Sequence, residues 1–399
     1  MPSLPHSRWA LGLALLIALV PSRCANGQGK GDAVHFDTAD GVKIEGTYWA
    51  SDKGKKAPVV ILLHDFHPKT GGSSQDDGWN SLAAALNKDG FAVLQFDFRG
   101  FGKSTTVDPT KFWTLPHNKY VKVAGFNPLK PPESIGHGDF ANNYYPALAN
   151  DVAAARAFLD RKNDGGELNT SSIVLIGAGD GAAIGALWLA TDLHRKRGVF
   201  LGMGVPIPDA RFIKFDATYD GKDVKCAVWL DISSRVPGST VPTRKLIEET
   251  GKVNKVPMAF LYGKGNKDSD QVALSCMKAI AGSSYKRGES PKDYPLCGDK
   301  DIDTKLTGSK LLQKNLDTEK WIVTGYLDAH RFFMQQKPDD ETPMKKHLKE
   351  EWRERDWTKS RYYWLFPGVT PALPQVVPAK NDNDMAPLLL PLGKFGIPL

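Results

Sequence analysis

Two patterns of apolar residues follow one another along the chain. Between residues 28 and 56, apolar and polar side chains alternate on either side of Ala39-Asp40-Gly41, which predicts an antiparallel hairpin, expected over residues 33–50. Beyond the hairpin the apolar residues stand in short continuous runs, as in strands that are buried on both faces. The runs that predict such strands are 58–65, 91–97, 172–177, 223–233, 256–263 and 320–327.

Helical spacing appears between these runs. It predicts helices over residues 78–90, 144–163 and 181–190, and a charged helix over 342–357. Strands that alternate with helices favour a mostly parallel sheet with helices on both faces, here with an antiparallel N-terminal edge. We find no internal repeat and no linker, so the sequence predicts one domain with the run 172–177 inside the sheet.

Some segments carry no clear period. Residues 104–142, 194–222 and 283–315 are expected to be loops or surface insertions. The last segment, 367–399, is a proline-rich tail that either lies over the domain or is disordered. The folded domain is therefore expected to span residues 28–366.

The N-terminus has the pattern of a signal peptide. Arg8 precedes the apolar run "WALGLALLIALV", which is too short to span a bilayer, and small residues before Gly27 suit a cleavage site. Cys24 follows an arginine, which does not fit a lipobox. We expect residues 1–27 to be removed and the protein to be secreted or periplasmic, with no transmembrane segment after cleavage.

The charge of the chain gives little information about a partner. The 399 residues carry a net charge of +7, and the lysines are scattered rather than gathered in a stripe. That distribution argues against nucleic-acid binding. We expect the partner to be a small molecule or a protein.

Cysteines are few. After the signal peptide they are Cys226, Cys276 and Cys297. Cys226 lies in a predicted buried strand, which leaves a possible bridge between Cys276 and Cys297 in an oxidising compartment. The spacing fits no metal motif, so no metal and no other cofactor is expected.

The segment "IVLIGAGDGAAIGALWLA" (173–190) reads as a strand, a glycine-rich turn and a helix of small residues. Catalytic elbows are built in this way, with a nucleophile at the apex of the turn. The turn here is Gly177-Ala178-Gly179-Asp180-Gly181. It also fits a dinucleotide-binding fingerprint, but no acidic residue ends the following run 198–205, as that motif requires.

In their order, four segments resemble the α/β-hydrolase superfamily, in particular its esterase-like and peptidase-like members. They are "LLHDFH" (62–67), "FDFRGFGKST" (96–105), the elbow at 177–181 and "LDAHRFF" (327–333). The similarity covers most of residues 35–350. It implies an α/β-hydrolase-like sheet, a nucleophile on the elbow, a histidine base oriented by a carboxylate, and backbone N–H groups that hold an oxyanion.

The resemblance places Gly179 in the nucleophile position, where serine is expected, and glycine has no side chain to attack with. A frame shifted by one residue would make Asp180 a carboxylate nucleophile, whereas the simpler interpretation of Asp180 is a helix-capping residue. A nucleophile on the loop 104–142 is a further alternative, although no residue there stands out.

The resemblance also assigns the remaining roles. His330 follows the last predicted strand, where the family keeps its base, and otherwise is a histidine with no partner to activate. Asp268 is the candidate carboxylate after residues 256–263, with a solvated loop aspartate as the alternative and Asn266 nearer to the usual place. Asp65 stands where a glycine is usual, and its charge would oppose a developing oxyanion unless His67 pairs with it or both hold a cation.

Two hypotheses follow from the sequence. In the first, the protein is an exported, non-catalytic member of the α/β-hydrolase superfamily, a pseudoenzyme that acts in binding or scaffolding. In the second, it is an active hydrolase of ester-type or related substrates that uses Asp180 or an unaligned nucleophile together with His330.

Overall fold

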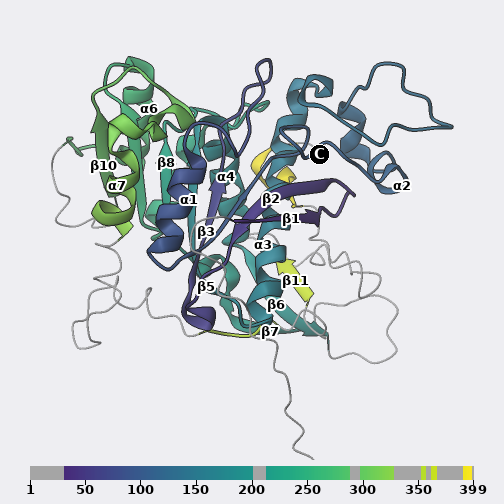
Figure 1. The fold of residues 1–399 in the computed structure, drawn as a ribbon, viewed down its shortest axis with the longest axis horizontal. Coiled ribbons are helices and arrows are strands. Elements are labelled where there is room, and N and C mark those ends of the chain that lie inside the picture. Colours follow the sequence, from purple (N-terminus) through teal and green to yellow (C-terminus); the bar gives the residue numbers. More distant parts are fainter. Residues whose placement is uncertain are drawn as a thin grey trace, which may run out of the picture.

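A central sheet of eight strands organises the molecule, in the order β1-β2-β4-β3-β5-β8-β9-β10 (Figure 1). The computed structural model describes residues 31–200, 213–287, 297–327, 352–355, 361–365 and 390–397. The strands of this sheet are β1 (Asp32–Asp37), β2 (Lys43–Trp49), β3 (Pro58–Leu63), β4 (Ala92–Phe96), β5 (Asn169–Ala178), β8 (Val224–Leu230), β9 (Met258–Gly263) and β10 (Cys297–Ile302).

The strand pairing confirms the predicted sheet. β1 and β2 form the expected antiparallel hairpin, and β2 also runs antiparallel to β4. All pairs from β4 through β10 are parallel. β5 lies between β3 and β8, and all ten of its residues are buried. The strand that ends at the elbow is therefore central, and its carboxyl end lies where open α/β sheets present their functional groups.

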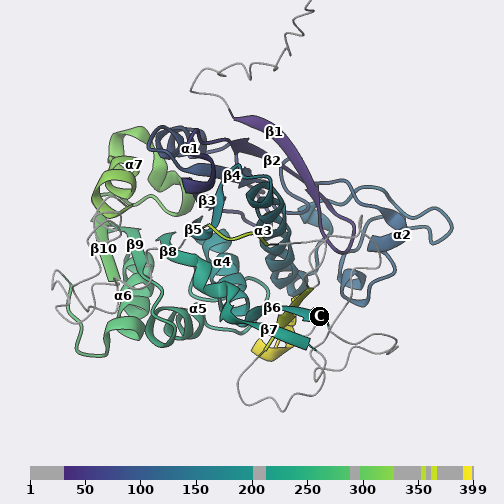
Figure 2. The ribbon, with the colours of Figure 1, turned by 90° about the horizontal axis from the view of Figure 1, so that it is seen from below.

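Helices cover both faces of the sheet (Figure 2). One face packs against α1 (Trp79–Lys88) and the segment of α7 (Thr318–Lys320) and η10 (Trp321–Leu327), through a core that includes Leu82 and Ile322. A larger core with Leu187 and Met277 joins the other face to its helices. These helices are α3 (Ala149–Asp164), α4 (Gly179–Asp192), α5 (Thr243–Ile247) and α6 (Lys267–Ala281). The chain therefore has an α/β-hydrolase-like fold.

Two predictions for the end of the sheet are wrong. Residues 320–327 were expected to form the last strand but are helical, with Ile322, Val323, Tyr326 and Leu327 buried on one side. The edge strand at this end of the central sheet is β10, which lies within the segment 283–315 that was expected to be an insertion. Its sequence CGDKDI is only partly buried at the sheet edge, so it lacks the continuous apolar run of a central strand.

The remaining segments lie around this domain. Residues 104–142 form loops, short 3-10 turns and the short helix α2 (Pro109–Phe112). The excursion 194–222 contributes β6 (Arg195–Phe200) and β7 (Ile213–Tyr219), which form a small separate sheet with β11 (Arg361–Trp364). The helix expected over 342–357 lies largely outside the described residues, and residues 352–355 are not helical. In the tail, Leu390, Leu392 and Ile397 are buried against the larger core.

Two further findings concern the membrane and the cysteines. Within the described ranges, no helix is both long and apolar enough to cross a bilayer. Cys226, Cys276 and Cys297 are free thiols, so the possible Cys276–Cys297 bridge is not formed in this structure. Burial, together with the neighbouring Asp299 and Cys276, raises the pKa of Cys297 to about 12.

Candidate functional site

The predicted elbow is present at the carboxyl end of the central strand. β5 ends at Ala178, and α4 begins at Gly179. Gly179 has a φ of +51°, in the left-handed region that glycine adopts without a steric penalty. A sharp strand-to-helix turn with no side chain at its apex therefore exists here.

The carboxylate of Asp65 fills the space above this apex. Asp65 follows β3, the neighbour of β5, so both residues lie at the same edge of the sheet. A Cβ atom placed on Gly179 would collide with Oδ1, Cγ and Oδ2 of Asp65. The volume that a nucleophile would need at position 179 is thus occupied by the side chain of another residue.

Two backbone N–H groups hold the Asp65 carboxylate in place. The N–H groups of Phe66 and Asp180 both donate to Oδ1 of Asp65, at 2.9 and 3.0 Å. Asp180 directly follows the apex, and Phe66 lies on the loop after β3. In esterase-like elbows, N–H groups from these two places form the oxyanion hole. Here both donors already have a charged acceptor.

A second glycine completes the surroundings of Asp65. Gly308 has a φ of +55°, and a Cβ atom there would collide with Oδ2 of Asp65. The next residue, Ser309, accepts a hydrogen bond from the backbone N–H of Asp65 at 3.0 Å and another from the Trp79 indole at 3.1 Å. The carboxylate therefore lies between two left-handed glycines, and any side chain at either position would displace it.

Three carboxyl groups gather at this edge. Burial, with a smaller contribution from the charges of Asp180 and Asp231, raises the pKa of Asp65 to about 6 in spite of its two N–H bonds. Burial likewise raises the pKa of Asp180, against a hydrogen bond from Ser233 at 2.5 Å and the charge of His67. Burial also raises the pKa of Asp231, which accepts from the N–H of Gly308 at 2.9 Å.

The structure brings together only part of the predicted site. Asp180 lies beside Asp65 at the elbow. Asp268 is exposed in the first turn of α6, where Asn266 caps the helix by accepting from the N–H groups of residues 268 and 269. His330 lies outside the described residues. His67 is exposed, and its charge lowers the pKa of Asp180. It does not pair directly with Asp65.

His64 has a structural role. One ring nitrogen, Nε2, accepts from the N–H of Phe98 at 3.1 Å, so the other, Nδ1, donates to the carbonyl oxygen of Asp65 at 2.7 Å. Burial lowers the pKa of His64, which keeps the ring neutral in this arrangement. The imidazole thus fixes the loop that presents the Asp65 carboxylate.

Asp231 and Gly308 were missed by the sequence analysis. A signal existed for Asp231, since it lies near the carboxyl end of the predicted strand 223–233, close to the edge where such strands present functional groups. It has a φ of +51°, which is uncommon for a residue with a side chain. Gly308 belongs to the segment expected to be an insertion, and nothing in its local sequence indicates contact with residue 65. In the described residues, no group of three or more His, Cys, Asp or Glu side chains is arranged to hold a metal ion.

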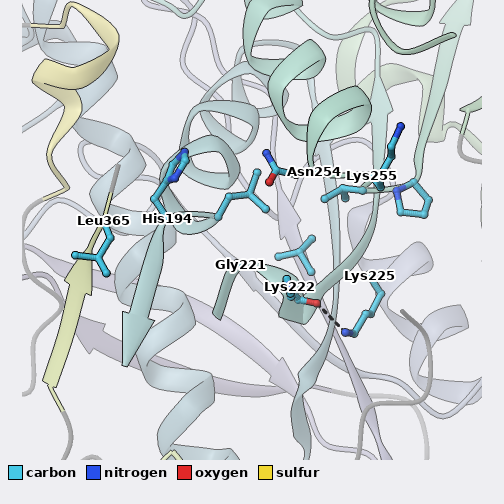
Figure 3. Close-up of a pocket in the computed structure, with 11 residues that line it drawn as sticks. His194, Gly221, Lys222, Lys225, Asn254, Lys255 and Leu365 are labelled. Carbon is cyan, nitrogen blue, oxygen red and sulfur yellow. Dashed lines mark hydrogen bonds between the residues drawn. The ribbon is translucent and has the colours of Figure 1, made fainter. Parts of the chain in front are cut away.

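A cavity of about 250 Å³ lies elsewhere, at the amino ends of β8 and β9 (Figure 3). His194, Lys222, Lys225 and Lys255 are among its lining residues. The Lys225 ammonium group donates to the carbonyl oxygen of Lys222 at 2.7 Å, and Lys255 points away from both. These polar groups do not converge on one point, so the elbow remains the candidate site.

Comparisons with known proteins give likenesses in structure alone. No protein-family model and no curated protein matches the sequence. Similar solved structures include an esterase from Pyrococcus furiosus, with 15% identity, a TM-score of 0.42, and coverage of 73% of this chain and 89% of that chain. The esterase domain of a Rhodothermus marinus protein has 12% identity and a TM-score of 0.42, with coverage of 75% and 98%. A dienelactone hydrolase from Anabaena variabilis has 12% identity and a TM-score of 0.42, with coverage of 77% and 98%.

Proposed function

We propose that this protein is a non-catalytic member of the α/β-hydrolase superfamily, which acts in binding or scaffolding rather than in ester hydrolysis. The observation that carries the proposal is the position of the Asp65 carboxylate. It occupies the place of the nucleophile and accepts hydrogen bonds from both N–H groups that would stabilise an oxyanion. A substrate carbonyl has neither an attacking atom nor free donors at this elbow.

The two glycines support this proposal. A serine that was merely lost from position 179 would leave an empty apex, but here Gly179 and Gly308 enclose a carboxylate that fits between them. The negative charge of Asp65 at neutral pH would also repel a developing oxyanion, because like charges at this distance in a half-buried site interact strongly. The elbow thus has a different set of interactions from that of a working esterase.

Labelling with a fluorophosphonate probe and turnover of p-nitrophenyl acetate test the proposal. We expect the wild-type protein to show neither labelling nor turnover above a heat-denatured control. The variant Asp180→Asn should behave like the wild type. Turnover by the wild type that disappears in a folded Asp180→Asn variant would contradict the proposal and establish Asp180 as a carboxylate nucleophile.

A double variant that introduces a serine at position 179 tests the same assignment. Gly179→Ser alone should remain unlabelled because the displaced Asp65 carboxylate stays close to the serine, where its negative charge opposes a developing oxyanion. Adding Asp65→Gly removes the obstruction and frees the N–H groups of Phe66 and Asp180. Labelling of the double variant, and not of either single variant, would support the assignment of position 179 as the nucleophile position.

Export is the second part of the proposal. It rests on the sequence of residues 1–27, with its arginine, short apolar run and small residues before Gly27. Expression of the full chain in a secreting host, followed by mass spectrometry of the mature N-terminus, tests it. A product that keeps its initiator methionine and stays with the cells would contradict export.

A further inference from the structure

The segment after α2 protrudes from the body of the molecule. In Figures 1 and 2 the chain that follows α2 reaches outward, away from the central sheet. This segment carries Leu129, which is 95% exposed, and Phe126, which is 43% exposed. Among the described residues, the other large apolar residue with such exposure is Val253, at 69%, which ends the separate segment η7 (Glu248–Val253). Two exposed large apolar side chains within four residues of one protruding segment make it a candidate interaction site.

This loop is held in a defined conformation. The Trp113 indole donates to the carbonyl oxygen of Pro132 at 2.8 Å, and its ring packs edge-on against Phe126 with 4.9 Å between centroids. Asn127 makes a turn in which its side chain accepts from the N–H of Leu129 at 2.9 Å and its carbonyl from that of Lys130 at 3.1 Å. Leu129 is thus presented to solvent by a preformed turn, at a low entropic cost for binding.

The segment that carries these residues has a net positive charge. Residues 109–134 contain four lysines and one glutamate, which gives a net charge of 4 − 1 = +3. The whole chain of 399 residues has a net charge of +7. The lysines, Lys111, Lys119, Lys122 and Lys130, are all exposed. Exposed apolar side chains together with exposed lysines in one segment match the surface of an anionic bilayer, which has negatively charged head groups over an apolar interior.

We propose that the loop of residues 122–133 docks on an anionic lipid surface. Leu129 and Phe126 enter the boundary between head groups and acyl chains, and the lysines contact anionic head groups. A narrow tip suits a bilayer, which deforms around it, better than a protein partner, which needs about 800 Å² of contact from each side. This proposal is independent of whether the elbow is catalytic.

Sedimentation with lipid vesicles tests the proposal. We expect the full-length mature protein to bind vesicles of phosphatidylcholine and phosphatidylglycerol in equal parts at low salt, and to bind pure phosphatidylcholine vesicles much less. Leu129→Ser should reduce binding about tenfold, the effect of withdrawing one leucine from an apolar environment. The matched control Val253→Ser removes the other exposed residue and should leave binding unchanged.

Two double variants that remove the same amount of charge test the role of the lysines. Lys122→Gln with Lys130→Gln should weaken binding to the anionic vesicles, whereas Lys314→Gln with Lys320→Gln, which changes the net charge equally at another exposed place, should not. Equal losses in both pairs would overturn the proposal in favour of general charge attraction. A wild-type protein that does not bind the vesicles would also overturn it. So would self-association, seen in sedimentation velocity, that Leu129→Ser abolishes while no vesicle binding occurs.

Discussion

At the amino-terminal edge of the central sheet, Arg156 pairs with three buried carboxylates. At the opposite edge lie the carboxylates of Asp65, Asp180 and Asp231. In the described part of the chain, none of these three pairs with an arginine or a lysine. The guanidinium of Arg156 lies 3.0 Å from a carboxylate oxygen of Asp160, 3.4 Å from one of Asp192 and 2.7 Å from one of Asp223.

The two groups have opposite electrostatics. Burial favours the neutral acid at both edges, but Arg156, Arg355 and Arg195 outweigh burial and hold the pKa of Asp160 below its usual range. At the elbow burial dominates, and the pKa of Asp65 rises to about 6. An arginine partner offsets much of the cost of burying a carboxylate, whereas a buried carboxylate without such a partner lowers stability, as is common at functional sites. The difference is consistent with the carboxyl edge as the candidate site.

The largest expected effect comes from removing the compensating charge. Arg156→Met leaves buried carboxylates without one of their partners, and we expect the free energy of unfolding to fall by about 3 to 5 kcal/mol. Urea unfolding at neutral pH, followed by circular dichroism, measures it. A loss below about 1 kcal/mol would show that Arg195, Arg353 and Arg355 suffice, and would break the contrast between the two edges.

Filling the elbow apex should have the next largest effect. Gly179→Ala places a side chain at positive φ and displaces Asp65, which leaves the N–H groups of residues 66 and 180 without their acceptor. We expect a loss of about 3 kcal/mol in unfolding free energy. In an Asp65→Gly background the same substitution should cost only about 1 kcal/mol. Equal costs in both backgrounds would show that Asp65 does not occupy the apex.

Neutralising Asp65 should stabilise the protein at neutral pH. Its pKa in the folded protein, about 6, lies above the ordinary value of 3.8, so the folded state binds the proton more tightly than the unfolded state. Stability from the protonated form is therefore fully present below about pH 4 and is lost as the pH rises through about 6. Asp65→Asn avoids that loss, and we expect a gain of about 2 kcal/mol at neutral pH.

Urea unfolding across this pH range measures the effect. Asp180 and Asp231 have pKa values raised in the same direction, so the pH dependence should shrink in Asp65→Asn rather than vanish. A variant that keeps the full pH dependence of the wild type would show that Asp65 is not the group that titrates there.

Asp180→Asn should have the smallest effect. Asp180 keeps a hydroxyl partner in Ser233, and the asparagine side-chain oxygen can accept the same hydrogen bond. We expect its unfolding free energy at neutral pH to stay within about 1 kcal/mol of the wild type. A gain as large as that of Asp65→Asn would make Asp180, rather than Asp65, the main uncompensated charge of the elbow.

The sequence by itself determined the sheet and the elbow. Continuous apolar runs predicted the strands β3, β4, β5, β8 and β9 because such runs are stable only when both faces of a strand are covered. The glycine-rich turn at 177–181 predicted the apex because its backbone conformation is a local property of those residues. The same local reasoning was wrong for residues 320–327, whose apolar side chains suit a buried helix as well as a strand.

Only the tertiary structure decided what the elbow contains. The contact between Asp65 and Gly308 joins positions far apart in the chain, and no local pattern specifies it. The strand β10 at the edge was missed for a related reason, since its pairing with β9 stabilises it more than its own composition does. A carboxylate held by two N–H groups between two glycines arises because parallel strands bring their carboxyl ends to one edge, and this convergence is a property of the assembled sheet.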